Sequence, residues 1–339
     1  MIYYPEPIKK NDIFGVVATS SGLSLEWYQK RLDKAYLNLK KLGYTCYETK
    51  SVRCNFQFVS NTKEARAKEF LDLWQDEKIS VISQVYGGEF LMEILPFLDK
   101  DIILKHKVKW VTGFSDSSLL NYYLTTKYNI ATLTTANIIH FGAHKLDKSL
   151  LDQLAILQTK KSRQESFSFY EKEKARKETN PYSTYNLDTK VVYKNLYSKK
   201  EEVITGRVIG GCIEALATII GTKYDNTVSF CRQFNEGMLW YLENFFSDPL
   251  TLYRILWQMK EANWFFNCNG FLIGRTRGTF QVDDFSYLDA LHKIFDDMKI
   301  PVIYDVDIGH LPPMWSMVNG SFGEFHYKNG KGYIIQDLK

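Results

Sequence analysis

A serine, a glutamate and a histidine each follow an apolar stretch in this 339-residue chain. Ser115 lies in "WVTGFSDSSLL", where a hydrophobic run stops at Gly113 and a helical pattern begins. A sharp turn from strand to helix can present a nucleophilic hydroxyl, and backbone N–H groups at the helix start can stabilise an oxyanion. The fifth position of G-x-S-x-G is Ser117 here, so this motif alone leaves open that Ser115 is a helix N-cap.

Glu243 ends the apolar stretch "MLWYLE", and His310 follows "IPVIYDVDIG". A histidine can remove the proton of a serine hydroxyl, and a carboxylate can hold that histidine in the required tautomer. Catalytic triads are defined by geometry, so the chain order Ser, Glu, His is permitted. Taken singly, Glu243 also fits a solvated loop carboxylate and His310 a structural histidine. His140 and His144, in "IIHFGAHK", are less easily assigned to the surface than the other histidines.

Two glycine pairs could bring the backbone close to a ligand. Gly87-Gly88 follows the apolar run "ISVISQV", where N–H groups free of side chains can approach a substrate. A tight turn explains this pair equally well. Gly210-Gly211 precedes a short apolar helix and could bind an anion at the helix start, although close packing of strand and helix is the favoured explanation.

Alternating strand and helix patterns predict the scaffold that would position these residues. In the first half we expect strands within 12–20, 44–52, 79–85 and 108–114, a helix from about Tyr28 to Leu42 capped by Gly43, and a second helix that begins at a capping box of Asn61 and Glu64. In the second half we expect a glycine turn and short helix within 206–222, strands within 237–243, 270–275 and 300–310, and a helix from Ser247-Asp248-Pro249 to about Met259. This alternation is typical of α/β proteins with parallel sheets.

The length favours two domains. Residues 1–157 are predicted to form a Rossmann-like domain with a parallel sheet that holds the nucleophile. Residues 158–202 are charged and weakly periodic, which indicates a linker or an excursion that could cover a cleft. Residues 203–339 are predicted to form a β-rich α/β domain that carries the glutamate and the histidine.

Composition excludes several classes of function. The net charge is only +4 and Lys and Arg are not clustered, which argues against nucleic-acid binding. The five cysteines form no CxxC pair, so neither a disulfide framework nor a zinc site is expected, and a reducing compartment fits. The first residues lack the pattern of a signal peptide, and no run is apolar enough to span a bilayer. We therefore expect a cytoplasmic protein that does not bind membranes.

Six segments in order resemble the serine LD-carboxypeptidase family, which includes the microcin-immunity peptidases. They cover most of the chain, and "GFSDSS" is similar to the family pattern G-[YF]-S-D-x-T. The segments are "GVVATSSG", "YGGEFLMEILPFLD", "GFSDSSLLNYYL", "GRVIGGCIEALATIIGT", "LWYLENFFSDPLTLYRIL" and "IPVIYDVDIGH". The ordered series is far more specific than any one of its members.

The resemblance implies roles for five residues. The family's nucleophile falls on Ser115, its glutamate on Glu243 and its histidine on His310, while its oxyanion hole falls on the backbone N–H groups of Gly88 and Asp116. The family places the serine on an N-terminal domain and the other two on a C-terminal domain. Its members cleave amide bonds near a free carboxylate, use no metal or other cofactor, and are often homodimers.

Three departures from the family concern substrate recognition. Tyr86 stands where many LD-carboxypeptidases have an arginine, 134–136 replace an HGP-like segment, and Cys212 replaces a common asparagine. These differences argue against recognition of a muropeptide terminus. The extra length and "GFLIGR" resemble the microcin-immunity branch, which hydrolyses peptidyl or aminoacyl nucleotide toxins. The alternatives are a muropeptide LD-carboxypeptidase of cell-wall recycling and a non-catalytic binding protein, which would keep Ser115 and His310 apart.

Overall fold

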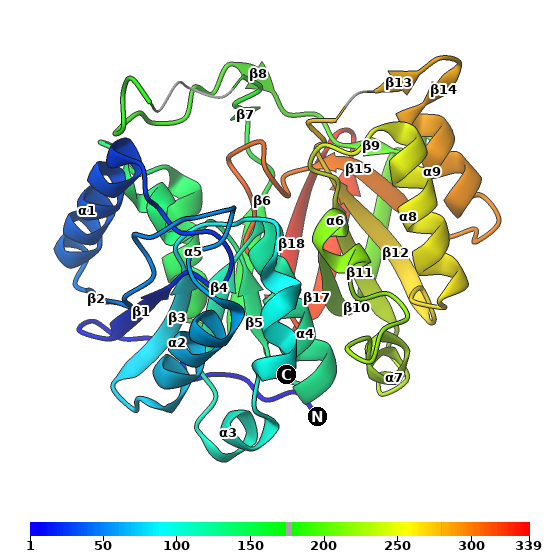
Figure 1. Cartoon of the computed structure of the whole chain (residues 1–339). Helices are drawn as coiled ribbons and strands as arrows, with labels where there is room; N and C mark the ends of the chain where they lie inside the picture. The colour runs from blue at the N-terminus through cyan, green and yellow to red at the C-terminus, as the bar shows by residue number, and fades with distance from the viewer. Residues whose placement is uncertain (174–177, 279) are drawn as a thin grey trace.

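The computed structural model describes residues 1–173, 178–278 and 280–339. Its α/β architecture is built on two mixed sheets that lie side by side, the first mostly blue to cyan and the second mostly green to red in Figure 1. Both sheets contain runs of parallel strands, as the sequence predicts. The predicted fold class, two α/β domains of which the first has a Rossmann-like parallel sheet, is therefore confirmed.

The first sheet has six strands in the order β16-β5-β4-β3-β1-β2. Five of them are parallel, and β16 pairs antiparallel with β5 although it comes from the far end of the chain. The central strands are buried almost throughout, as expected for a sheet covered on both faces. The strands are β1 (Ile13–Val17), β2 (Thr45–Glu48), β3 (Ile79–Gln84), β4 (Trp110–Gly113), β5 (Thr132–Thr134) and β16 (Met317–Asn319).

Helices cover this sheet and follow the predicted periodicity. In the first helix, Leu32, Ala35 and Leu39 are buried on one face, and Gly43 follows its end with a φ of +93°. The second helix is capped by the side chain of Thr62, which accepts a hydrogen bond from the Ala65 N–H, so the predicted cap at Asn61 is wrong by one residue. The helices are α1 (Glu26–Lys41), α2 (Lys63–Gln75), η1 (Leu91–Phe97), α3 (Lys100–Lys105), η2 (Ser115–Ser117), α4 (Ser118–Tyr128), η3 (Ile138–Gly142) and α5 (Lys148–Leu157).

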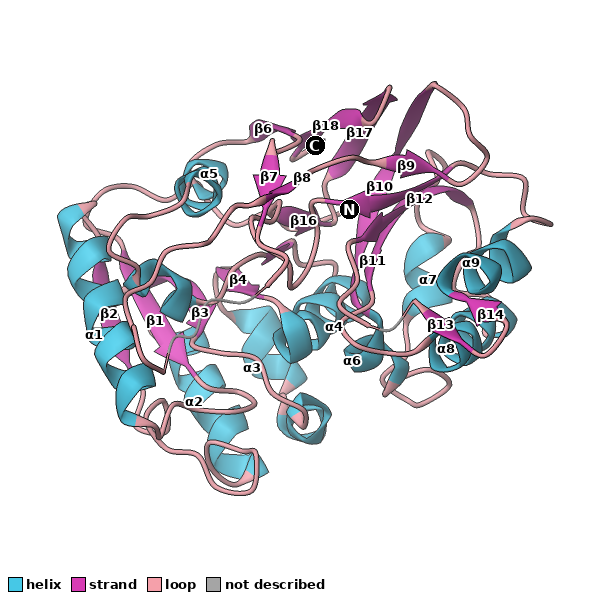
Figure 2. Cartoon of the chain, turned by 90° about the horizontal axis from the view of Figure 1, so that it is seen from above, coloured by secondary structure: helices cyan, strands magenta, loops and turns pink. Residues whose placement is uncertain are grey.

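The second sheet has eight strands in the order β6-β18-β17-β10-β11-β12-β15-β9. Its parallel core is β10 (Glu201–Cys212), β11 (Met238–Glu243), β12 (Cys268–Gly274) and β15 (Val302–Val306), and β17 (Phe322–Lys328) and β18 (Lys331–Asp337) extend it antiparallel. The accompanying elements are α6 (Ile213–Ala217), α7 (Thr227–Cys231), α8 (Pro249–Glu261), β13 (Gln281–Val282), β14 (Phe285–Ser286) and α9 (Tyr287–Phe295). Helices α8 and α9 lie together at one side of this sheet in Figure 2.

The predicted glycine turn at Gly210-Gly211 is wrong, because both residues lie inside the twelve-residue strand β10. A Cβ atom on Gly210 would overlap the carbonyl oxygen of Tyr241 in the neighbouring strand. One on Gly211 would lie 2.9 Å from the Ser118 Oγ at the start of α4. The pair therefore permits close packing of backbone and helix, the explanation favoured over anion binding.

The charged segment 158–202 contributes strands to the second sheet. β6 (Lys161–Glu165) pairs with β18, and β9 (Lys194–Asn195) pairs with β15 at the opposite edge. Between them, β7 (Phe169–Tyr170) and β8 (Thr189–Lys190) form a short ribbon above the gap between the two halves in Figure 1. Residues 174–177 of this segment lie outside the described ranges.

The two ends of the chain meet on the side opposite this ribbon (Figure 1). The Tyr4 hydroxyl donates hydrogen bonds to the carbonyl oxygens of Gly320 (2.8 Å) and Lys339 (3.0 Å). Together with β16, this contact ties the end of the second half to the first. In the described ranges, none of the helices combines the length and apolar character needed to cross a membrane.

Candidate active site

Ser115 lies at the sharp turn between β4 and the 3-10 helix η2. Its φ of +64° is in the left-handed region, which a side chain other than glycine adopts only when its surroundings hold it there. Gly87 makes room for it, since a Cβ atom at that position would lie 2.8 Å from the Ser115 Cβ. A Cβ atom on Gly113 would similarly lie 2.7 Å from the Gln84 side chain. Small residues therefore allow the strained turn to fit between neighbouring strands.

Neutral hydrogen bonds hold the backbone on both sides of Ser115. The Phe114 N–H donates to Asn137 Oδ1 at 3.2 Å, and the Asn121 amide donates to the Gly113 carbonyl at 3.0 Å. The Ser117 hydroxyl donates to the Tyr86 carbonyl at 3.1 Å, which joins the start of the helix to the turn after β3. These bonds keep the serine oxygen at the carboxyl edge of the first sheet, where sites gather in open α/β folds.

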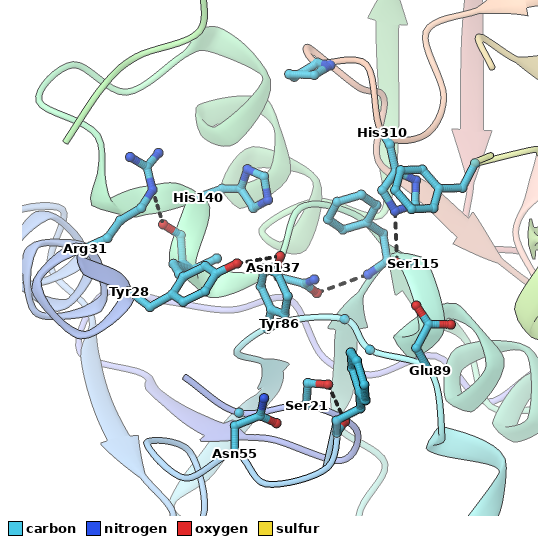
Figure 3. Close-up of a pocket in the computed structure, with 18 of the residues that line it drawn as sticks. Ser21, Tyr28, Arg31, Asn55, Tyr86, Glu89, Ser115, Asn137, His140 and His310 are labelled. Carbon is cyan, nitrogen blue, oxygen red and sulfur yellow. Dashed lines mark hydrogen bonds between the residues drawn. The ribbon is translucent and has the colours of Figure 1, made fainter. Parts of the chain in front are cut away.

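His310 and Glu243 approach Ser115 from the second sheet. The Nε2 atom of His310 is 2.9 Å from the Ser115 Oγ (Figure 3). On the other side of the ring, Nδ1 forms a hydrogen bond with Glu243 Oε1, which also accepts the His310 backbone N–H at 3.0 Å. The Glu243 side chain is buried, and a Cβ atom on the preceding Gly309 would overlap it. The structure thus brings together the three residues that the sequence singles out from distant strands.

Two phenylalanines fix the plane of the histidine ring. The Phe245 ring stacks on the His310 ring with centroids 3.9 Å apart and planes 25° apart. The Phe114 ring approaches it from the other half of the molecule at 4.8 Å. Phe245 follows Glu243 by two residues, and Phe114 directly precedes Ser115. The His310 ring is therefore packed by residues from the two turns that also carry its hydrogen-bond partners, Glu243 and Ser115.

A buried ion pair lies behind the loop that carries His310. The Arg275 guanidinium forms an ion pair with Asp307, whose side chain is fully buried. Arg275 Nη2 also donates to the carbonyl oxygens of Leu311 (2.9 Å) and Pro313 (3.1 Å), on the far side of the histidine. The Tyr193 hydroxyl donates to Asp307 Oδ2 at 2.5 Å. The histidine loop is therefore held at both ends by one arginine and tied to the segment 158–202.

Glu214 holds the turn that follows Glu243. Its Oε1 atom accepts hydrogen bonds from the backbone N–H groups of Phe245 (3.0 Å), Phe246 (3.1 Å) and Ser247 (3.2 Å), and from the Ser247 hydroxyl at 2.9 Å. A carboxylate that accepts several N–H bonds fixes a loop more firmly than a neutral acceptor would. Glu214 therefore sets the position of Phe245 and, through it, of the histidine ring.

The family resemblance implies an oxyanion hole at Gly88 and Asp116. Asp116 follows Ser115 in the chain, and Gly88 lines the same pocket as the serine. Gly88 has a φ of +151°, and a Cβ atom there would overlap the Ser20 side chain. The Asp116 side chain points inward, where its Oδ2 accepts hydrogen bonds from the Ser20 hydroxyl (2.5 Å) and the Leu91 N–H (2.9 Å). Burial raises the pKa of Asp116 to about 6, and the charge of Glu89 adds to the rise. The carboxyl of Asp116 thus braces the loop after Gly88, while its backbone remains beside the serine.

A pocket of about 570 Å³ opens onto the serine and histidine (Figure 3). Both halves of the molecule contribute to its wall, and several aromatic rings line it on the side of the first sheet. Tyr86, at the position where the family resemblance implies an arginine, is one of them, and its hydroxyl accepts a hydrogen bond from Tyr28 at 2.9 Å. The aromatic lining residues are Trp27, Tyr28, Phe58, Tyr86, Phe114 and Phe245.

The two remaining histidines of interest hold the segment 158–202 over this pocket. His140 lines the pocket, and its Nδ1 is 3.0 Å from the Tyr185 hydroxyl. The His144 N–H donates to the Tyr182 carbonyl at 2.9 Å. Among the described residues, no group of three or more His, Cys, Asp and Glu side chains is arranged to bind a metal ion.

Sequence reasoning missed the residues that support the three central ones. Asn137, Glu214 and Asp307 carry polar groups that are buried or enclosed, yet they belong to apolar segments where neighbours give no sign of their partners. The only available signal was a charged residue inside an otherwise apolar stretch, as with Asp307 in "YDVDIGH" and Arg275 after "GFLIG". Such a residue is rarely buried without a partner.

Comparisons with known proteins agree with the fold. Residues 14–135 match the model of the LD-carboxypeptidase N-terminal domain, and residues 205–324 match that of the C-terminal domain. The microcin C7 self-immunity protein MccF of Escherichia coli is 24% identical over 329 residues, with 93% of this chain and 90% of that protein covered. A probable murein peptide carboxypeptidase of Bacillus subtilis is 22% identical over 320 residues, with 92% and 88% covered.

A solved structure of MccF in complex with aspartyl sulfamoyl adenosine superposes with a TM-score of 0.83 at 21% identity, and 98% of each chain is covered. At this identity the likeness is one of fold. The two domain matches together span more than two thirds of the chain and include the turn of Ser115 and the strand that ends at Glu243. The chain therefore belongs to the LD-carboxypeptidase family.

Proposed function

We propose that the protein is a metal-independent serine peptidase that hydrolyses an amide bond next to a carboxylate or nucleotide terminus. The observation that supports this most directly is the position of His310, with Nε2 2.9 Å from the Ser115 oxygen and Nδ1 bonded to the buried Glu243. A histidine between a hydroxyl and a carboxylate is the arrangement that activates serine for attack on a carbonyl.

In the proposed reaction, His310 Nε2 accepts the Ser115 proton while the serine oxygen attacks the carbonyl carbon. The carboxylate of Glu243 keeps the proton on Nδ1 and stabilises the imidazolium that forms. The histidine then gives its proton to the leaving amine, the C–N bond breaks, and an acyl-serine remains. Water repeats the sequence with the same base and releases the acid.

We assign the oxyanion to the backbone N–H groups of Gly88 and Asp116. Asp116 follows the serine in the chain, Gly88 lines the same pocket, and the inward-facing carboxyl of Asp116 accepts hydrogen bonds from Leu91 and Ser20. A single oxyanion donor is typically worth about 3 kcal/mol of the barrier. Their preorganisation would therefore account for a large part of the rate.

The aromatic wall favours a nucleotide-linked substrate of the microcin-immunity type. Trp27, Tyr28 and Phe58 line the pocket, and Phe58 is 67% exposed, so its ring is available to a flat ligand. Aromatic rings bind nucleobases by stacking. The similar protein MccF has been solved with aspartyl sulfamoyl adenosine. The alternative substrate is a cell-wall tetrapeptide that is cleaved at its L,D bond. The similarity to the Bacillus subtilis protein supports this alternative.

The proposal is tested by incubating the protein with aspartyl sulfamoyl adenosine and with the tetrapeptide L-Ala-γ-D-Glu-L-Lys-D-Ala. Release of aspartate or of D-alanine, measured by chromatography, identifies the substrate. Ser115→Ala should reduce hydrolysis by about 10⁴-fold or more because it removes the nucleophile. Ser229→Ala, on the exposed side of α7, is the matched control and should keep full activity.

Full activity of the Ser115→Ala variant, with circular dichroism unchanged, would end the assignment. A non-catalytic binding protein would instead bind one of the two ligands and hydrolyse neither. The geometry speaks against that alternative, because the serine and histidine are in hydrogen-bond contact and face an open pocket.

A further inference from the structure

Arg277 lies in the loop after β12 and forms part of the wall of the pocket that is also lined by His310. This loop packs against the turn that follows Glu243: the Arg277 N–H donates to the Phe245 carbonyl at 3.1 Å. Thr276 is buried and accepts a hydrogen bond from the Asn244 amide at 3.0 Å. The Gly278 N–H donates to the same threonine oxygen at 2.9 Å. The backbone on both sides of Arg277 is therefore fixed to the strand end that carries the glutamate.

The side chain of Arg277 lines the pocket and remains exposed to solvent. Within residues 1–173, 178–278 and 280–339, no acidic side chain lies within ion-pair distance of its guanidinium, and no protein acceptor takes a hydrogen bond from it. A guanidinium offers five N–H donors in a planar fork that matches a carboxylate or a phosphoryl group. Its position leaves this fork available to a ligand.

The other arginine of the pocket is occupied by the protein itself. Arg31 is 2% exposed, and its Nε and Nη1 atoms donate to the carbonyl oxygens of Ile139 (3.2 Å), Pro181 (2.5 Å) and Ser183 (3.1 Å), while its Nη2 is buried. It therefore anchors the segment 158–202 to α1. Of these two arginines, Arg277 is the exposed one, so its charge is the more accessible to an incoming substrate.

Chemistry decides which end of the substrate lies beside Arg277. The leaving amine receives its proton from His310 Nε2, so it must lie against the histidine and the second sheet. Phe245 joins this wall, because its ring stacks on the histidine while its carbonyl binds Arg277. The acyl part then extends away from the histidine toward Asn137 (Figure 3), and the aromatic rings of Trp27, Tyr28 and Phe58 remain for the base of a nucleotide leaving group. Arg277 therefore faces the leaving group.

We propose that Arg277 binds an anionic group carried by the leaving amine and thereby determines which amides the site accepts. The inference rests on the proposed function. Two leaving groups share this chemistry: an amino acid with a free carboxylate, and a nucleotide with an anionic sulfamate or phosphoryl group next to the amine. A charge-assisted, two-pronged contact of this kind is worth at least about tenfold in selectivity.

The first experiment compares Arg277→Gln with the wild type on three substrates. These are L-Ala-γ-D-Glu-L-Lys-D-Ala, the same peptide with a C-terminal amide, and aspartyl sulfamoyl adenosine. If the anion is a carboxylate, the variant loses at least about tenfold in kcat/KM on the acid peptide and less than about twofold on the amide. If the anion belongs to the nucleotide, the loss falls on aspartyl sulfamoyl adenosine. Arg277→Lys should restore part of the loss because the positive charge returns.

The matched control is Glu89→Gln, which changes the charge of another residue that lines the same pocket. It should not reduce the preference for the acid peptide over the amide. An equal loss on all three substrates in Arg277→Gln, or an equal loss of preference in Glu89→Gln, would overturn the inference, since either shows a general effect of pocket charge.

A binding measurement separates this inference from the proposed function. Titration calorimetry with the Ser115→Ala variant gives the Kd of each of the three ligands without turnover, and the same titrations are repeated with Arg277→Gln added. The acid peptide or the nucleotide should bind at least about tenfold more weakly after the second substitution. Unchanged Kd values, or no measurable binding of any of the three, would overturn the inference even if the wild type hydrolyses one of them. Selective loss of binding without hydrolysis would support it while the proposed function fails.

Discussion

The serine and the histidine are positioned by different kinds of interaction. Around Ser115, neutral hydrogen bonds join residues that follow the ends of neighbouring strands in one sheet, such as Asn137 to the Phe114 N–H. Around His310, a buried ion pair joins Arg275 and Asp307 and recruits residues more than a hundred positions away. Each neutral hydrogen bond contributes modestly to the free energy of folding, whereas a buried charge that has lost its partner destabilises the fold strongly. Substitutions on the serine side and on the histidine side should therefore differ in how much stability and activity they remove.

The largest expected effect is on the histidine side. Arg275→Met leaves the carboxylate of Asp307 buried without its cation, which should lower the free energy of unfolding by about 3–5 kcal/mol. It also releases the carbonyl oxygens of Leu311 and Pro313, so kcat should fall more than KM rises. Urea unfolding and steady-state kinetics measure the two quantities.

Two further variants sharpen this test. Arg53→Met removes an arginine from a partly exposed ion pair with Glu48 and should cost no more than about 1 kcal/mol. Arg275→Met combined with Asp307→Leu should recover much of the stability but not kcat, because no charge remains unpaired while the loop has lost its anchor. Recovery of both would mean that the ion pair only stabilises the fold.

The same contrast explains what could be predicted from the sequence. The turn of Ser115 was foreseeable because its signals are local: an apolar strand, Gly113, a serine and the start of a helix lie within a few residues. The apolar strands that end at Glu243 and precede His310 were equally visible. Only the family resemblance implied that Glu243 and His310 lie close to the serine, because no local pattern indicates which strand ends of two sheets face each other.

The roles of the supporting residues depend on tertiary contacts that no local sequence pattern indicates. Glu214 binds the turn at 245–247 from a short helix some thirty residues earlier. The sequence predicts a turn at the glycine pair within β10, because it cannot show that Tyr241 of the next strand passes close by. The segment 158–202 was polar and aperiodic, yet β6 and β9 pair with strands at opposite edges of the second sheet. Pairing of this kind is set by partners far along the chain.

A second test concerns the buried carboxyl beside the serine. The ordinary pKa of an aspartate is 3.8, whereas burial raises that of Asp116 to about 6. Between these pH values the folded protein keeps a proton that the unfolded chain has released. The contribution of Asp116 to the free energy of unfolding therefore falls as the pH rises from about 4 to about 6, by up to about 3 kcal/mol.

Asp116→Asn should remove this pH dependence while an amide oxygen still accepts hydrogen bonds from Ser20 and Leu91. The stability difference between variant and wild type, measured by urea unfolding at several pH values, should then change in favour of the variant as the pH rises from 4 to 6. Asp72→Asn, at an exposed site on α2, is the control and should leave the wild-type profile nearly unchanged. A difference that stays constant with pH would show that the Asp116 carboxyl titrates at its ordinary value.

The smallest expected effect tests the neutral bonds of the serine turn. Asn137→Ala leaves the buried Phe114 N–H without its acceptor, at a cost of about 1–2 kcal/mol. Because Ser115 holds a left-handed conformation that its neighbours must maintain, kcat should fall about tenfold, while the histidine loop and its ion pair stay intact. Asn137→Asp keeps an acceptor for the same N–H and should retain more activity than the alanine variant. If Asn137→Ala instead lowers stability as much as Arg275→Met does, the neutral and charged sides of the site do not differ in the way their contacts indicate, and the strained turn depends on this single bond.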